Sequence, residues 1–297
     1  MNVLTGIIHG IDYALSCGLL GLVVFYVFIV TAGGHKARDL LGDFANQFRM
    51  FALLTLVSTT VFSALSIESI TESWALRDLW NGFAITSFGH LWCIRIVMLA
   101  MLMFATFRFP KSRMGISALI GWIVAILLLS VLSGHSGSQN NSFILRAATD
   151  WTHALAVGVW SGGLWLLYVW LGRRLGKPEF DASASQPVVK RFSLFAMCST
   201  GFILMTGILT ALLSGVSILA PWSSQYGCLV ALKIGLFGGA LLAASFNQFI
   251  HLRHWIPENE IVCVSSIRRE VLIEVVILAV VFIVVGFLTR TALPGEV

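Results

Sequence analysis

The sequence predicts an all-α polytopic membrane protein with eight transmembrane helices. Hydrophobic residues make up 58% of the 297 positions and charged residues only 11%, whereas a soluble domain carries about 25% charged residues. Apolar stretches long enough to cross a hydrocarbon layer about 30 Å thick recur eight times along the chain. Each stretch is continuously apolar, unlike the alternating strand of about ten residues that builds a membrane barrel. We therefore expect helices throughout.

The first apolar stretch is expected to stay in the protein as a spanning helix. No basic residue precedes it and Asp12 lies within it, and neither feature is typical of a cleaved signal peptide. In chain order, the expected spans cover residues 4–32, 47–68, 83–107, 114–133, 150–172, 192–218, 226–250 and 270–293.

The basic residues predict the orientation. Of the 19 Lys and Arg residues, 14 fall in the loops that follow spans one, three, five and seven, while the opposite side holds only Arg77, Arg146 and Arg290. Because basic loops stay in the cytoplasm, both termini are expected on the periplasmic side. The net charge of +5 thus reflects topology, and we expect no nucleic-acid partner. The basic loop residues are Lys36, Arg38, Arg49, Arg108, Lys111, Arg113, Arg173, Arg174, Lys177, Lys190, Arg191, Arg253, Arg268 and Arg269.

The two halves of the chain share a weak internal similarity. Gly89 is followed six residues later by Arg95, and Gly227 is followed six residues later by Lys233. Other short matches occur in the same order, which favours a parallel repeat of two four-helix halves, 1–149 and 150–297, within a single membrane domain. These matches are Ala14-Leu15 with Ala154-Leu155, Gly18 with Gly158, and Arg49 with Arg191.

The five cysteines show no CxxC motif and no paired spacing in an external loop, so neither a disulfide framework nor a zinc finger is expected. Those within spans are expected to act as small apolar side chains. The cysteines are Cys17, Cys93, Cys198, Cys228 and Cys263.

Four histidines from four different spans fall on the predicted outer side, and two of them have a carboxylate at helical spacing. His9 precedes Asp12 by three residues, and Asp150 precedes His153 by three, which places each pair on one helix face. Imidazole and carboxylate groups together are typical of a metal site. We expect His9 and His90 about two turns below the outer surface and His135 and His153 at helix ends, where these residues could converge on one metal ion with Asp12 and Asp150. The alternative is structural: Asp12 neutralises Arg95, and the histidines form interfacial hydrogen bonds.

Other polar and soft side chains lie within the spans. Cys93, Met98 and Met101 follow His90 along the same helix, and their sulfur atoms would suit a descending Cu(I) path, although methionine at this spacing also serves core packing. Asn247 and Glu274 share a depth near the cytoplasmic side and are expected to bond to each other. Lys233 either belongs to the electrostatics of the outer site or reaches the membrane surface.

Signatures of hydrolases and nucleotide-driven pumps are missing, since the chain has no GxSxG, P-loop, HExxH or GxGxxG sequence. We therefore expect a protein that is not an enzyme.

The residues together resemble the bacterial copper-resistance CopD/PcoD inner-membrane proteins. The resemblance is closest from about residue 130 onward and depends on the order and spacing of short motifs. These are Ser133-Gly134-His135-Ser136, His153-Ala-Leu-Ala, Trp160-Ser-Gly-Gly-Leu164, Arg191-Phe192-Ser193, Thr206-Gly207, Tyr226-Gly227, Leu232-Lys233, Asn247, Arg268-Arg269-Glu270, Glu274 and Pro294.

This resemblance implies an eight-helix, multi-pass inner-membrane protein that acts with a periplasmic CopC-like copper carrier and moves copper toward the cytoplasm. The functional residues it implies are His135 and His153, with His9 and His90 as further candidates. One alternative comes from the residues themselves: histidines near one face of a helical bundle also suit haem b, with two of them as axial ligands. The leading interpretation is a copper permease, and the alternative is a membrane electron-transfer protein. A third interpretation is a membrane scaffold or sensor whose outer polar cluster is purely structural.

Overall fold

The computed structural model describes residues 3–30, 34, 44–108, 112–134, 143–176, 185–215, 222, 224–246 and 260–291, and within these ranges it contains helices and no strand. Eight helices are long and apolar enough to span a membrane, which confirms the predicted fold class. The helices are α1 (Val3–Val24, continued by the π-helical turn Phe25–Ile29), α3 (Phe44–Thr71), α4 (Leu76–Ile85), α5 (Ser87–Ala105, continued by Thr106–Arg108), α6 (Arg113–Leu132), α7 (Phe143–Leu175), α8 (Ser185–Leu213), α9 (Gln225–Phe246) and α10 (Glu260–Leu288).

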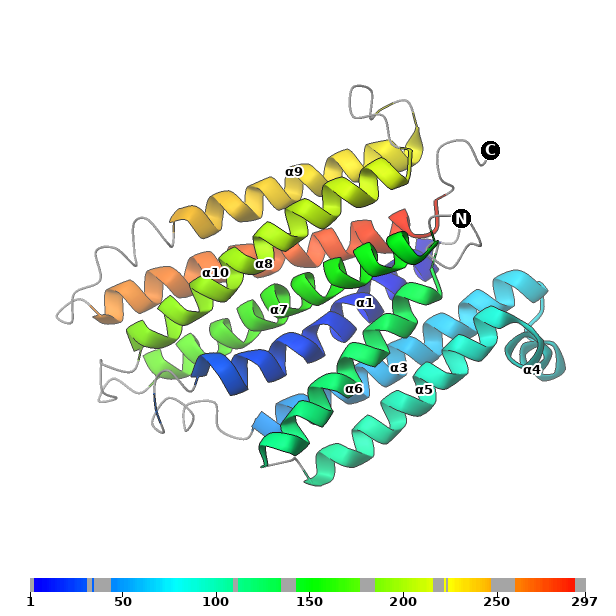
Figure 1. Cartoon of the computed structure of the whole chain (residues 1–297), viewed down its shortest axis with the longest axis horizontal. Coiled ribbons are helices and arrows are strands. Elements are labelled where there is room, and N and C mark those ends of the chain that lie inside the picture. Colours follow the sequence, from blue (N-terminus) through cyan, green and yellow to red (C-terminus); the bar gives the residue numbers. More distant parts are fainter. Residues whose placement is uncertain are drawn as a thin grey trace.

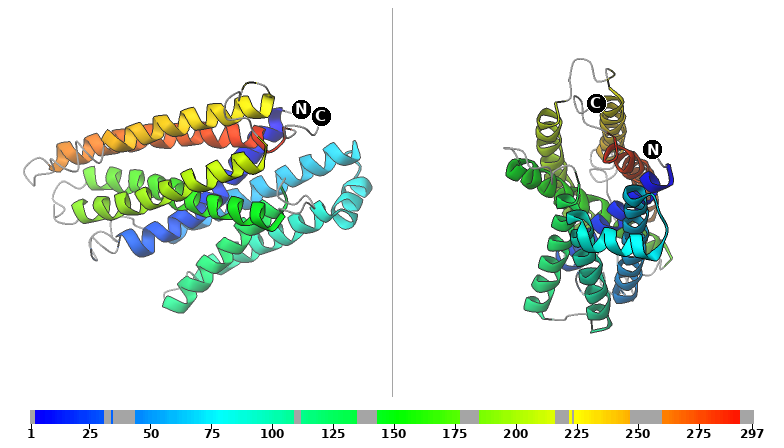
Figure 2. Two further views of the ribbon diagram at one scale, coloured as in Figure 1. Left: turned by 45° about the horizontal axis from the view of Figure 1, so that its top comes forward. Right: turned by 90° about the vertical axis from the view of Figure 1, so that its right-hand side faces the viewer.

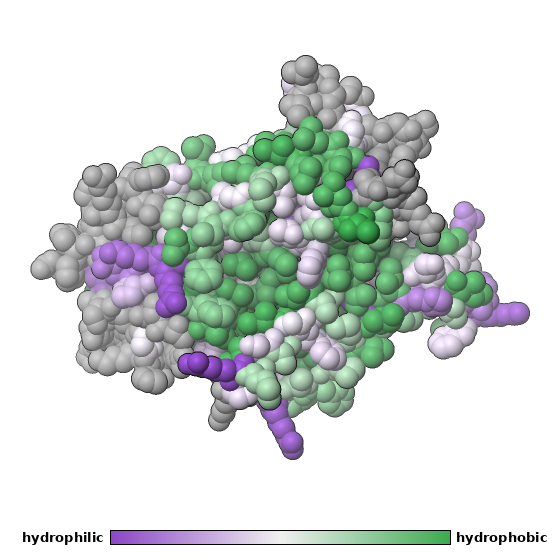
Figure 3. Space-filling model, in the orientation of Figure 1, coloured by the Kyte–Doolittle hydropathy of each residue, from purple (hydrophilic) through white to green (hydrophobic). Residues whose placement is uncertain are grey.

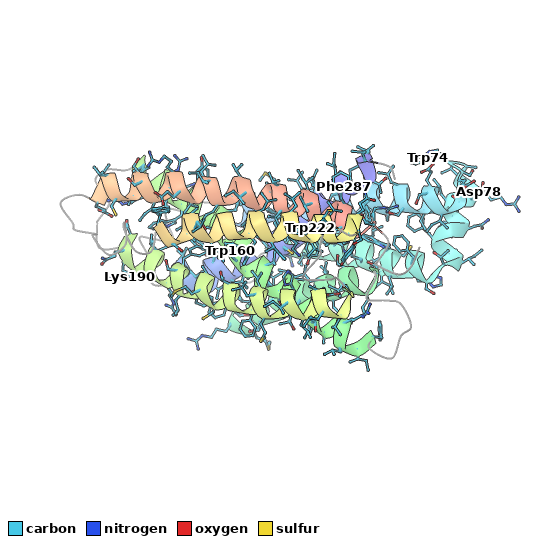
Figure 4. All side chains as sticks on the ribbon, turned by 90° about the horizontal axis from the view of Figure 1, so that it is seen from above. Trp74, Asp78, Trp160, Lys190, Trp222 and Phe287 are labelled. Atoms are coloured by element: carbon cyan, nitrogen blue, oxygen red, sulfur yellow. The ribbon has the colours of Figure 1, made fainter. Side chains whose placement is uncertain are left out.

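The spanning helices run side by side, and α4 lies across one end of the bundle (Figure 1, Figure 2). The start of α1 and the end of α10 lie at the same end as α4. We call this the outer end, following the predicted orientation, and the opposite end the inner end. Hydrophobic side chains form a broad band between the ends, while the most hydrophilic side chains gather toward the ends (Figure 3). In Figure 4, Trp74 and Asp78 lie at the outer end, Lys190 at the inner end and Trp160 between them. This distribution is typical of a protein surrounded by lipid.

Helix α1 is the centre of the fold. It packs against α3 and α6 from the first half of the chain and against α7 and α10 from the second. In the first half of the chain, α1 packs against α3 and α6, and α5 packs against α6. In the second half, α7 packs against α8 and α10 in the same way, and α9 packs against α10. Within the described residues, the packed pair α3–α5 has no such counterpart between α8 and α9, and the division into halves at residue 149 stays a prediction. The α1–α7 interface joins the two halves.

Glycines allow α1 to approach its neighbours closely. A Cβ atom on Gly162 of α7 would lie 2.5 Å from the Gly18 carbonyl oxygen and 2.8 Å from the Gly21 Cα of α1. At the outer end, a Cβ on Gly10 of α1 would lie 2.5 Å from the Phe282 carbonyl oxygen of α10. Lipid provides no hydrophobic force between helices, so such close backbone packing supplies much of the association energy.

Two differences from the expected spans have physical causes. Helices α7, α8 and α10 begin seven to ten residues earlier than expected, because charged and polar residues in their first two or three turns interrupt the apolar stretch by which each span was recognised. At the inner end this extension is stabilised by a buried ion pair: Arg174 Nη2 lies 2.8 Å from Glu260 Oε2, and Arg174 Nε donates to the Ser185 hydroxyl. Because α7 begins at Phe143, His153 lies well inside this helix, and the prediction that it sits at a helix end is wrong. Lys190, Arg191, Arg268 and Arg269 likewise belong to helices and not to loops.

The second difference is α4, which the continuous apolar stretch at 83–107 concealed. Thr86 has an extended backbone, and its hydroxyl accepts a hydrogen bond from the Gly89 amide, so it caps α5 and ends α4. Leu76 and Trp80 of α4 are largely exposed. His90 consequently lies in the first turn of α5, not two turns into a span.

Candidate functional site

Asp12 and Arg95 form a buried ion pair between α1 and α5. Arg95 Nη1 lies 2.9 Å from Asp12 Oδ2, and neither residue is exposed. The Ser58 and Thr59 hydroxyls of α3 donate to Asp12 Oδ1, while the Ser16 hydroxyl accepts from Arg95 Nη2. Both carboxylate oxygens of Asp12 are therefore engaged. Asp12 thus neutralises Arg95, as the structural alternative predicted, and its role as a metal ligand stays a prediction.

His9 lies on the same face of α1 as Asp12, as its spacing predicts. Its ring stacks on Phe62 of α3 with centroids 4.3 Å apart. Its Nδ1 atom is buried and has no hydrogen-bond partner among the described residues. Arg290, just beyond α10, donates to the Ser66 hydroxyl of α3 over 3.1 Å, and burial lowers its pKa. His9 lies near the charges of Asp12, Arg95 and Arg290. It therefore belongs to the same polar cluster as Asp12, between helices of the first half of the chain.

His90 points away from this cluster. Its side chain is exposed, and Nε2 lies 2.7 Å from the Ala84 carbonyl oxygen of α4. Trp92 and Arg95 lie on the buried face of α5, and His90 lies on its exposed face, away from the core of the bundle.

The soft side chains of α5 do not form the expected path inside the bundle. Cys93 and Met101 are exposed on the outer surface of α5, whereas Met98 is half-buried and packs against the core. The cause is the peripheral place of α5, since only the face with Leu99 and Leu102 turns inward. All five cysteines lie in described parts of the chain, and none of them is paired there.

The second cluster lies between α7 and α8, in the outer part of the bundle. Thr210 Oγ1 donates to Asp150 Oδ1 over 2.8 Å, and Thr206 Oγ1 lies 2.9 Å from His153 Nδ1. Both acid and imidazole therefore face α8, as their spacing predicts. The threonines are four residues apart on α8 and so lie on one face of it. We call Asp150, His153, Thr206, Thr210 and Lys233 the outer polar site.

The hydrogen bonds of Thr206 fit one tautomer of His153. The Thr206 hydroxyl lies 2.5 Å from the Phe202 carbonyl oxygen of its own helix, which accepts its single proton. A hydroxyl that donates to Phe202 accepts from His153, and this arrangement fits the tautomer whose proton is on Nδ1. In that tautomer the lone pair is on Nε2, which is the form of histidine that binds a metal ion.

Lys233 of α9 belongs to the electrostatic environment of this site. It lies near enough to Asp150 and His153 for an electrostatic interaction. This proximity agrees with a role in the site, and the choice between the two interpretations of Lys233 stays a prediction. The sequence analysis did not assign Thr206 or Thr210 to the site, although Thr206-Gly207 is one of the motifs of the resemblance and the two threonines lie four residues apart on one span.

The described residues do not combine the predicted ligands into one metal site. Within the described ranges, no three His, Cys, Asp or Glu side chains lie close enough together to hold an ion. His9 and Asp12 belong to one cluster, Asp150 and His153 to another, and His90 to neither. His135 and Asn247 lie outside the described residues. Glu274 is buried on α10, and its expected bond to Asn247 stays a prediction.

Comparisons with known proteins cover most of the chain. The family model described as Copper resistance protein D-like, N-terminal domain, matches residues 2–143, and that described as Copper resistance protein D matches residues 186–288. The sequence motifs placed the resemblance mainly from about residue 130 onward, and the first match extends it over the N-terminal half of the chain. Asp150 and His153 lie between the two matched segments, whereas Thr206, Thr210 and Lys233 lie within the second.

A curated relative is also similar to part of the chain. Copper transport protein CutJ of Bacillus subtilis (strain 168) is 25% identical over 158 residues, which cover 51% of this chain and 28% of that protein. The chain thus spans less than a third of the length of this relative. No solved structure matches. The two family matches, on a bundle of eight membrane-spanning helices, show that the chain belongs to the copper resistance protein D family.

Proposed function

We propose that this protein is a copper permease that takes copper ions from the outer side of a bacterial inner membrane and moves them toward the cytoplasm. Copper is the cargo, and the outer polar site is where it is first held within the membrane. A periplasmic CopC-like carrier is the proposed donor. Both comparisons name copper, and the haem alternative draws support from neither.

The observation that carries this proposal is the state of His153. The hydrogen bond between His153 Nδ1 and the Thr206 hydroxyl fits the tautomer that leaves Nε2 able to bind a metal ion, and neutral imidazole suits copper. Asp150 lies one helical turn nearer the outer end and adds a negative charge that attracts a cation. A hydrogen-bonded imidazole and a carboxylate inside a membrane span are costly unless they serve a function. His135 is proposed as a further ligand, by its family motif alone.

Replacing His153 with alanine is expected to lower the initial rate of copper uptake by roughly 10- to 100-fold, because the copper ligand is lost. The measurement is copper accumulation in cells that express equal amounts of each variant in the membrane. Thr206→Val should lose roughly tenfold, since the imidazole remains but its tautomer is no longer fixed.

The matched control is Thr152→Val. Thr152 is the neighbour of His153, but its hydroxyl bonds to the Ala148 carbonyl oxygen of its own helix, so uptake should stay at the wild-type rate.

His90→Ala tests whether copper is held by the outer polar site alone or by all four predicted histidines together. Uptake at the wild-type rate favours the outer polar site alone, and a loss as large as that of His153→Ala would favour convergence of all four histidines. Wild-type uptake by His153→Ala would refute the proposal.

A further inference from the structure

Helix α4 lies at the periphery of the bundle, beside the outer ends of α3 and α5. In Figure 1 it is seen almost along its axis, and Figure 2 shows it crossing the direction of the spanning helices. Helix α5 begins two residues after α4 ends and, with its continuation to Arg108, has 22 residues. At 1.5 Å per residue this span covers about 33 Å, which is close to one hydrocarbon thickness. The end of α4 therefore lies at the outer boundary of the hydrocarbon.

Helical periodicity gives α4 three faces. The first packs on the protein: Gly82 is buried, and a Cβ atom on it would overlap the Ile67 side chain of α3. The other two faces lie on either side of this contact. The apolar face holds Leu76, Leu79, Trp80, Phe83 and Ala84, and the polar face holds Arg77, Asp78 and Asn81, with Ile85 at its end.

The apolar face is left open by the described residues of the chain. Leu76 is 86% exposed and Trp80 is 72% exposed. Trp74, which lies at the outer end in Figure 4, just precedes the helix and is 59% exposed. Tryptophan is enriched at the membrane boundary, because its indole ring is apolar and carries one polar N–H group. Two exposed tryptophans at this level of the bundle therefore indicate lipid as the occupant of the face.

The helix is also joined firmly to the first turn of α5. The Thr86 hydroxyl donates to the Gly82 carbonyl oxygen over 2.6 Å, and His90 Nε2 lies 2.7 Å from the Ala84 carbonyl oxygen. A Cβ atom on Gly89 would lie 2.5 Å from the Gly82 carbonyl oxygen, so the two helices approach each other closely at this corner. Any force that holds α4 at one depth therefore also holds the outer start of α5, the helix that carries Arg95.

We propose that α4 is a lipid anchor that lies flat in the headgroup region of the leaflet at the outer end. Leu76 and Trp80 contact the acyl chains, while Arg77 and Asn81 face water. A peripheral helix at the membrane boundary has protein on one side, hydrocarbon on a second and water on a third, and the three faces of α4 match these surroundings. Since Arg77 and Asp78 compensate each other in charge, the partner is a zwitterionic phospholipid surface.

The first test introduces the photoreactive amino acid p-benzoylphenylalanine into the full-length chain, in place of Trp80 or, as the matched control, of Asn81. Each protein is illuminated in phosphatidylcholine nanodiscs, and mass spectrometry measures covalent lipid adducts. Position 80 should yield at least about fivefold more lipid adduct than position 81, because only the apolar face meets the acyl chains. Equal yields, or a cross-link from position 80 to this chain or to a second copy in place of lipid, overturn the proposal.

Illumination of intact cells tests for a protein occupant of the same face. The proposal expects position 80 to form no adduct with another protein. A cross-link from position 80 to a periplasmic or membrane protein would show that a protein partner covers the apolar face, and the lipid anchor would be wrong.

A second measurement serves if the photoreactive chains do not fold. Amide hydrogen exchange in residues 76–85 is compared in nanodiscs for two double variants. Leu76→Glu with Trp80→Glu should speed this exchange at least about tenfold, because α4 loses its contact with lipid. Arg77→Glu with Asn81→Glu places the same groups at the same spacing on the polar face and should stay within about twofold of the wild type. Equal exchange in the two variants overturns the proposal.

This inference does not depend on copper. Its failure would leave the proposed function unchanged, and wild-type copper uptake by His153→Ala would leave the lipid anchor unchanged.

Discussion

Gly162→Ala is expected to separate α1 from α7 and to destabilise the protein by about 3 kcal/mol. The new Cβ would lie 2.5 Å from the Gly18 carbonyl oxygen and 2.8 Å from the Gly21 Cα. Both are backbone atoms of α1, so no side-chain rotation relieves the overlap, and one helix must move. Because α1 also packs against α3, α6 and α10, its displacement disturbs the whole bundle. Thermal unfolding of the purified protein in detergent measures the effect.

The matched control for this substitution is Gly201→Ala on α8. A Cβ there would meet no atom within 4 Å, and alanine in a helix interior is more favourable than glycine by roughly 0.5–1 kcal/mol. The control should therefore keep or slightly raise the melting temperature. Similar melting temperatures for Gly162→Ala and Gly201→Ala would contradict the close packing of α1 on α7.

Replacing Arg95 with methionine is expected to cost about 3–5 kcal/mol, because the substitution leaves the Asp12 carboxylate buried without its cation. Both side chains are fully buried, so water does not compensate for the loss. The double variant Arg95→Met with Asp12→Leu should recover most of the stability, since apolar pairs often replace buried ion pairs without penalty. A double-mutant cycle in thermal unfolding measures this coupling.

The same cycle separates the two roles considered for Asp12. If Asp12 serves only to neutralise Arg95, the stable double variant should take up copper at the wild-type rate. A double variant that is stable and lacks copper uptake would restore Asp12 to the transport route. Thr60→Val is a control for a substitution on α3 that leaves the ion pair untouched. The Thr60 hydroxyl is exposed and bonds to its own helix, whereas the neighbouring Thr59 bonds to Asp12.

The main features of the fold were predictable because a membrane limits the choices. Continuous apolar stretches in a span of about 20 residues allow only helices, and all eight are present. The polar helix extensions were not predictable from hydropathy, since the first turns of α8 and α10 are stabilised by the Arg174 ion pair with Glu260. The break between α4 and α5 depends on a single capping residue, Thr86, inside an apolar stretch.

For the site, spacing along one helix was informative and convergence between helices was not. The spacings of His9 with Asp12 and of Asp150 with His153 correctly placed each pair on one face, because helical periodicity fixes that relation. Which helices those faces would meet depends on packing. The two pairs face different partners, α3 and α8, and His90 turns outward because Trp92 and Arg95 occupy the inner face of α5. The threonines that bond to the second pair carry only weak signals, which are the Thr206-Gly207 motif and their spacing of four residues on one span.

The central claim is that His153 binds copper through its Nε2 atom. The most direct test is Cu(I) binding to the purified wild-type chain and to His153→Ala, followed by X-ray absorption at the copper edge. The account predicts imidazole nitrogen in the copper coordination sphere of the wild type and an affinity at least about tenfold lower in the variant. Equal affinity, with the same nitrogen signal in both proteins, would contradict it.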